Sequence, residues 1–150
     1  MSGARRPFVI EKGLSAKCSP DEMMTYLLDA TAWPSWQPEI VSTQGPERLK
    51  SGDVVSGHAE MLGFHVDGRS IALQVDENVF EEDVVVGVAM KVRYEVHPEE
   101  GGCRVVHRLE SRLPGGIAGR LLSLFLRRRL RRMQSSAVAH LVAQSEAAAP

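Results

Sequence analysis

The stretch from residue 18 to 38 constrains the fold more than any other part of the sequence. It reads CSPDEMMTYLLDATAWPSWQP. Ser19 suits a helix N-cap, and Pro20 suits the first helical position, where its missing N–H breaks no hydrogen bond. A short helix is therefore expected, followed by a polar connection that contains Trp33 and Trp36. Two tryptophans in such a connection need an apolar surface, so we expect short helices that cover a hollow or a core edge.

Seven extended segments and one long helix account for most of the remaining chain. Alternating apolar and polar residues predict the strands, and the clusters at 50–53 and 98–102 mark turns. Neither Gly nor Pro occurs from residue 120 to 149, which predicts one helix from Ile117 to about Ser145. The predicted strands are residues 8–17, 40–49, 54–62, 64–76, 84–88, 89–97 and 103–113.

The tryptophan segment resembles the opening of the START/SRPBCC superfamily, the birch-pollen-allergen-like proteins. In that family the first strand is followed by A-P-x-E-x-V-W and then by D-x-x-x-W-x-x-W-x-P. The chain departs from this pattern at Cys18 and Ser19 and at Met24 and Thr25. Residues 101–105 read Gly-Gly-Cys-Arg-Val, which is similar to the family's G-G-T-R-V. The residues that match the family pattern are Pro20, Glu22, Asp29, Trp33, Trp36 and Pro38.

The resemblance and the order of elements imply an α+β helix-grip fold. A β-α-α-β6-α order suits a curved antiparallel sheet of about seven strands, wrapped around a long C-terminal helix with an internal cavity. A length of 150 residues, 43% of them hydrophobic, fits one domain over residues 1–150, with 1–6 and 146–150 as flexible tails. The N-terminal sequence lacks the apolar run of a secretory signal, so we expect a cytoplasmic protein.

Charge is distributed unevenly along the chain. Residues 1–100 contain nine basic and 17 acidic side chains, a net charge of −8, whereas residues 101–150 contain nine and two, a net charge of +7. On the predicted C-terminal helix, Arg127, Arg128 and Arg131 fall on the face away from the core. We expect a solvated basic face, with contact to a membrane surface or an acidic partner as the alternative and no nucleic acid as partner.

The other face of this helix is apolar and carries flexible or small side chains, none of them β-branched or aromatic. At about 100° per residue it collects Leu122, Leu126, Leu130, Met133, Ala137 and Leu141. Such a face suits a deformable cavity, which the resemblance also implies; the alternative is a fully packed core. The residues predicted to contact a ligand are Trp33, Trp36, Met61, Ile71, Leu73, Met90, Val92, Tyr94, His107, Leu122, Leu126 and Met133.

Three polar residues are candidates for chemistry in this cavity. Strand alternation places His107 between apolar neighbours and Tyr94 on the apolar side of its strand. The simpler interpretation of both is a buried side chain with satisfied hydrogen bonds. Alternation also carries Arg69 inward, as an anion-binding or polarising group, unless a bulge at Gly68 or a pair with Asp67 intervenes.

The cysteines and histidines form no metal-binding pattern. Cys18 and Cys103 lack a CxxC or Cys/His spacing, and the five histidines are scattered, so we expect no metal, no cofactor and two buried thiols. The suspected fold pairs the end of the first strand with the start of the last, which would bring the two cysteines near each other. A disulfide is the alternative to free thiols.

Three classes of function remain open. The first is binding or transport of a hydrophobic or amphipathic small molecule, such as a lipid, isoprenoid or polyketide-like compound. The second is a polyketide cyclase, aromatase or dehydratase that uses Tyr94, His107 or Arg69. The third is an interaction module that docks through its basic helix. The sequence lacks a nucleophile elbow, a P-loop and a dinucleotide loop, so we favour the first class, in a monomer or homodimer.

Overall fold

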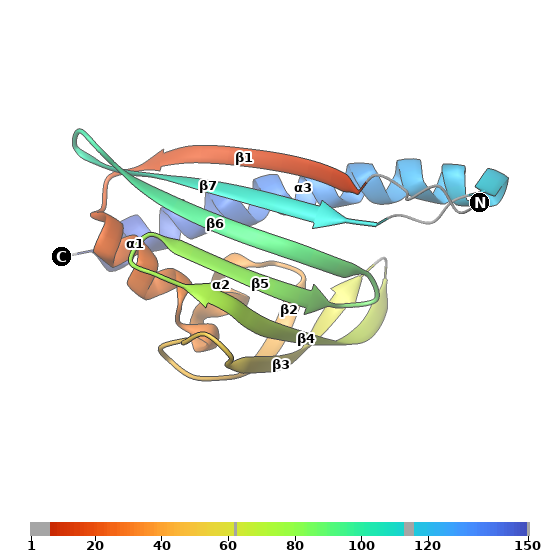
Figure 1. Ribbon diagram of the computed structural model, residues 1–150, viewed down its shortest axis with the longest axis horizontal. Helices are drawn as coiled ribbons and strands as arrows, with labels where there is room; N and C mark the ends of the chain where they lie inside the picture. Colours follow the sequence, from red (N-terminus) through yellow and green to blue (C-terminus); the bar gives the residue numbers. More distant parts are fainter. Residues whose placement is uncertain (1–6, 62, 113–115, 150) are drawn as a thin grey trace.

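The computed structural model describes residues 7–61, 63–112 and 116–149 and has the predicted α+β helix-grip architecture (Figure 1). Its strands form one antiparallel sheet in the order β1-β7-β6-β5-β4-β3-β2. The strands are β1 (Phe8–Ala16), β2 (Ile40–Gln44), β3 (Val54–Met61), β4 (Phe64–Val75), β5 (Val79–Val85), β6 (Ala89–Glu99) and β7 (Gly102–Ser111). The helices are α1 (Pro20–Leu27), the 3-10 helix η1 (Ala30–Ala32), α2 (Trp33–Trp36) and α3 (Gly116–Ala148).

The short helices begin where the sequence places them. The Ser19 hydroxyl accepts a hydrogen bond from the Glu22 amide at 3.1 Å, which caps α1. The Trp33 indole N–H donates to the Leu27 carbonyl oxygen at 3.0 Å and ties α2 to the end of α1. Both tryptophans are buried, so the two short helices close one end of the curved sheet.

The long helix α3 packs its buried stripe against the inner face of the sheet, mainly on β1 and β7. Its first turns extend past the ends of these two strands (Figure 1). Leu122, predicted to face the sheet, is 47% exposed, so this prediction is wrong. Near Leu122 the stripe runs through Ser123 and Leu126 instead, and the projecting part of the helix has little sheet to cover it. The buried stripe consists of Ser123, Leu126, Leu130, Gln134, Ala137, Val138, Leu141, Val142 and Ser145.

Strand β4 has the predicted alternation but the opposite orientation. Ile71 and Leu73, expected to point inward, are 39% and 40% exposed, and Arg69 is exposed with them. Ile71 lies opposite Val54 in the sheet, and Val54 is exposed as well. The inner positions are occupied by the small residues Ser70 and Ala72. The inward predictions for Ile71, Leu73 and Arg69 are therefore wrong, because the apolar side of this strand faces outward.

Other boundaries differ more modestly from the expected ones. Strand β5 begins at Val79 instead of residue 84, and α3 continues to Ala148 instead of ending near residue 145. The expected tail residues 1–6 and 150 lie outside the described residues.

Cys18 and Cys103 are buried free thiols, as expected, and Cys103 pairs with Ala16 at the end of the β1–β7 ladder. Burial raises the pKa of Cys103 to about 12, and the neighbouring Cys18 thiol is the second cause of this shift.

Two leucines of α3 test this helix packing. Leu130 is fully buried, whereas Leu121 is 73% exposed. We expect Leu130→Ala to lower the free energy of unfolding by about 2–5 kcal/mol, because it removes buried side-chain volume. Leu121→Ala, the same change on the same helix, is expected to alter it by no more than about 0.5 kcal/mol. Urea unfolding followed by circular dichroism measures both, and equal effects would contradict the packing.

Candidate functional site

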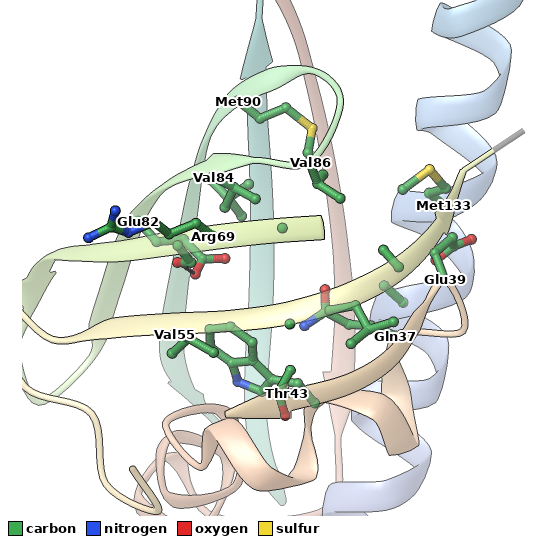
Figure 2. A pocket seen from close by; sticks show the side chains of 18 of the residues that line it. Gln37, Glu39, Thr43, Val55, Arg69, Glu82, Val84, Val86, Met90 and Met133 are labelled. Carbon is green, nitrogen blue, oxygen red and sulfur yellow. Dashed lines mark hydrogen bonds between the residues drawn. The ribbon is translucent and has the colours of Figure 1, made fainter. Parts of the chain in front are cut away.

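A cavity lies between the inner face of strands β3–β6 and helix α3. The cavity volume is about 110 Å³, within a wider hollow of about 850 Å³ that includes open solvent at the mouth. Figure 2 shows Val84, Val86 and Met90 on the sheet side, with Met133 of α3 opposite. The cavity volume lies below the roughly 300–1,000 Å³ of typical small-molecule sites, and the wider hollow adds open space at its mouth.

Small residues on two strands create this space. Gly57 of β3 lies directly opposite Gly68 of β4, and both line the cavity. The next inward positions carry Ala59 and Ser70, which also line it. A Cβ at Gly57 would lie 2.4 Å from the backbone oxygen of Ser42, and one at Gly68 would lie 3.3 Å from the Val86 side chain, so neither position has room for a larger residue. The alternation of the strands thus places the smallest residues where the helix covers the sheet least.

Aromatic rings form the inner end of the cavity. The Phe80 ring stacks on Tyr94 with centroids 5.8 Å apart, and Trp33 lies 6.3 Å from Phe80. The Trp36 ring meets Tyr94 edge-on at 6.1 Å, but Trp36 is only 1% exposed and does not line the cavity. Trp33 and Tyr94 do line it. Burial, and secondarily the charge of Glu82, raises the pKa of Tyr94, so its hydroxyl stays protonated.

His107 is held in one orientation by Gln134 of α3. The Gln134 side-chain nitrogen lies 2.9 Å from Nδ1 of His107 and 3.1 Å from each of the His107 and Ile10 carbonyl oxygens. The Gln134 amide nitrogen donates to the two carbonyl oxygens and lies within hydrogen-bond distance of the ring nitrogen. Burial lowers the pKa of His107 to about 4, which keeps the ring neutral. Its edge contacts the Tyr94 ring at a centroid distance of 4.7 Å.

Glu82 is a buried carboxyl in the same cavity that the sequence analysis missed. It is 4% exposed, and the Ser70 hydroxyl donates a hydrogen bond of 2.5 Å to its Oε2. Burial raises the pKa of Glu82 to about 7, an effect that the Ser70 hydrogen bond partly offsets. The sequence contained a signal, because Glu82 shares strand parity with Phe80 and Val84, both of which have side chains on the inner face.

The predicted ligand residues divide into two groups. Seven of the twelve line the cavity: Trp33, Met61, Met90, Val92, Tyr94, His107 and Met133. Arg69 also borders it, although its side chain is exposed. Five do not line it: Trp36, Ile71, Leu73, Leu122 and Leu126. Lining residues that the prediction missed include Val55, Ser70, Glu82, Val84, Gln134 and Ala137.

Neither a metal cluster nor a spanning helix was found in the described part of the chain. Among residues 7–61, 63–112 and 116–149, no group of three or more His, Cys, Asp or Glu side chains is arranged to hold a metal ion. Within the same ranges, no helix combines the length and apolar character that crossing a bilayer requires.

The fold and the cavity define a helix-grip domain with space for a small molecule. The sequence matches the family described as polyketide cyclase / dehydrase and lipid transport over residues 10–146, so the chain belongs to this family. No curated protein sequence matched it.

Solved structures share the fold at low sequence identity. The Zhui aromatase/cyclase from a Streptomyces species is 13% identical, with a TM-score of 0.79 over 93% of this chain and 94% of that one. A START superfamily protein from Mycobacterium smegmatis is 17% identical, with a TM-score of 0.66 over 91% and 97%. The di-domain ARO/CYC StfQ from the steffimycin biosynthetic pathway is 17% identical, with a TM-score of 0.77 over 94% of this chain but 51% of StfQ. This chain thus spans about half of StfQ, and the START/SRPBCC resemblance is confirmed at the level of fold.

The two buried ionisable groups predict opposite effects of pH on stability. Because burial raises the pKa of Glu82, its contribution to the free energy of unfolding is fully present below about pH 4.5 and is lost as the pH rises through about 7. The loss amounts to about 3 kcal/mol. The lowered pKa of His107 gives a contribution that is present above about pH 6.5 and lost as the pH falls through about 4. The two contributions largely cancel in the wild type.

Single variants separate these contributions. Relative to wild type, Glu82→Gln should gain stability as the pH rises from about 4.5 to 8, whereas His107→Gln should gain stability as the pH falls from about 6.5 to 4. Urea unfolding at several pH values measures the differences. A stability difference for Glu82→Gln that does not change with pH would show that this carboxyl is not held as described.

Proposed function

We propose that this protein binds and carries a hydrophobic or amphipathic small molecule, such as a lipid, an isoprenoid or a polyketide-like compound. The observation that carries the proposal is the cavity between sheet and helix, whose inner surface is mostly apolar. Met61, Met90 and Met133 contribute flexible side chains to this lining. Such a lining adapts to an elongated apolar ligand, whose affinity comes from the apolar area removed from water.

The buried polar groups support an amphipathic ligand. The Glu82–Ser70 pair and the Tyr94 hydroxyl are polar groups in a space whose surface is mostly apolar. A ligand with one hydroxyl or carbonyl group can hydrogen-bond to them while its apolar part lies along the methionines. A few placed polar groups in an apolar pocket are the usual source of orientation and specificity in small-molecule sites.

A bulky substitution tests the cavity directly. Met133→Trp fills space between α3 and the sheet, so it should weaken binding of the apolar fluorescent probe aminoanthracene by about tenfold or more, at a stability cost of about 1–3 kcal/mol. Leu122→Trp is the matched control, because Leu122 lies on the same helix but outside the cavity. Native mass spectrometry of gently purified protein should also show a bound small molecule in wild type and lose it in Met133→Trp. Wild-type binding by Met133→Trp would refute the site.

Catalysis is a second candidate function, favoured by one specific observation. The carboxyl of Glu82 has a pKa raised to about 7 by burial, and a general acid or base works best with a pKa near the working pH. It lines the same cavity as Tyr94 and His107, and its charge acts on Tyr94. In the family's polyketide cyclase/dehydrase role, these groups would move protons on a chain folded within the cavity.

Conservative variants separate the carrier from the enzyme. If the protein is a carrier, Tyr94→Phe, His107→Gln and Glu82→Gln should change the affinity for the molecule identified by mass spectrometry only modestly. If it is an enzyme, Glu82→Gln or Tyr94→Phe should lower the turnover of that molecule by about 10²–10⁴-fold while binding persists. A loss of turnover of this size in these variants, with binding of the molecule retained, would replace the carrier proposal with the enzyme.

A further inference from the structure

The projecting part of α3 exposes an unusual number of large apolar side chains. Leu121 is 73% exposed, Leu124 59% and Phe125 55%. Phe64, at the start of β4, is 72% exposed. Gly63, the residue before Phe64, lines a groove together with Phe125, Arg128, Arg129 and Arg132 of α3. We call the surface formed by Phe64, Leu121, Leu124, Phe125, Arg128 and Arg132 the basic-apolar face.

Helical spacing aligns the members of this face along one side of α3. Leu121, Phe125, Arg128 and Arg132 are separated by four, three and four residues, so they follow one another along the helix for about 16 Å. The buried stripe, which includes Leu126 and Leu130, lies on the opposite side. The apolar residues of the face therefore have no part in the helix–sheet core.

Charge on the helix is almost entirely of one sign. Residues 116–148 contain six arginines, and their one acidic residue is Glu146, near the C-terminal end. Not all the arginines belong to the basic-apolar face. The guanidinium carbons of Arg127 and Arg131 lie 5.1 and 5.5 Å from the centre of the Phe8 ring, so these two side chains cover β1. Arg127, Arg128 and Arg131 are all exposed, as expected of a solvated basic face, and two of them also contact Phe8.

This composition discriminates between possible partners. A symmetric contact between two copies would bring Arg128 and Arg132 of both chains into one interface, where the basic-apolar face has no acidic residue to pair with them and like charges repel. A nucleic acid would pair with the arginines but would leave the leucines and Phe125 without apolar contacts. An anionic bilayer satisfies both sets, because apolar side chains insert among the lipids while arginines contact the phosphates.

We propose that the basic-apolar face docks this protein on the surface of an anionic lipid bilayer. Leu121, Phe125 and Phe64 enter the boundary between headgroups and acyl chains, and Arg128 and Arg132 contact lipid phosphates. The groove of this face includes Arg129, and Met133 of the cavity lies one helical turn further along α3. Docking therefore places one border of the cavity beside the lipid surface, although the docking itself does not depend on what the cavity binds.

Vesicle co-sedimentation of the full chain tests this docking. Wild type should bind vesicles of phosphatidylcholine mixed with phosphatidylglycerol, bind vesicles of phosphatidylcholine alone far more weakly, and lose part of its binding at physiological salt. Arg128→Gln with Arg132→Gln should lower the partition coefficient about tenfold, and Leu121→Gln with Phe125→Gln should lower it by a similar factor. Circular dichroism should show all variants folded, because the substituted side chains are exposed.

A matched control distinguishes the effect of the basic-apolar face on vesicle binding from the effect of the protein's net charge. Arg104→Gln with Arg108→Gln removes two exposed arginines from β7 and should change binding by no more than about twofold. An equal loss in this control, or no binding to anionic vesicles by wild type, would overturn the proposal. It would also be overturned if ultracentrifugation without lipid showed a dimer that Leu121→Gln with Phe125→Gln dissociates. The cavity variant Met133→Trp should still bind vesicles, so loss of ligand binding and loss of docking are distinguishable.

Discussion

The packing of α3 on β1 and β7 is the interaction on which the rest of the structure depends. Leu130, Val138 and Leu141 are fully buried in this contact, and each such burial stabilises the fold by about 1.5–3 kcal/mol. Gln134 adds hydrogen bonds to Ile10 and His107, which fix the helix against both strands. Because α3 packs mainly at this edge of the sheet, the small inner residues of β3 and β4 are left to border a cavity.

The chemistry of this cavity follows from burial of neutral polar groups. His107 is kept neutral by a lowered pKa and Glu82 tends toward its neutral form through a raised pKa, in both cases because burial disfavours the charged form. Each group has one defined side-chain partner, Gln134 or Ser70. A neutral interior with oriented hydrogen-bonding groups accepts an uncharged amphipathic molecule without burying an unpaired charge.

Much of the fold could be predicted from the sequence because local signals agreed with the global order. The Ser19–Pro20 cap, the paired tryptophans and the uninterrupted C-terminal helix all have the expected positions. The residues of the site were harder to predict, because the alternation of side chains along a strand defines two faces but does not show which of them is buried. In β4 the apolar residues Ile71 and Leu73 lie outside, while Ser70 faces the cavity. A hydrophobic pattern therefore misplaces a strand whose inner face is kept small to leave space.

The arginines of α3 link helix stability to what lies outside the helix. Arg127 with Arg131 and Arg128 with Arg132 are like-charged pairs four residues apart, a spacing that destabilises an isolated helix. The repulsion between Arg127 and Arg131 is offset by their contact with the Phe8 ring. Arg128 and Arg132 face outward beside exposed apolar side chains. Anions at this surface would relieve the second repulsion. The same residues that weaken the helix in water thus favour a state in which the helix lies against negative charge.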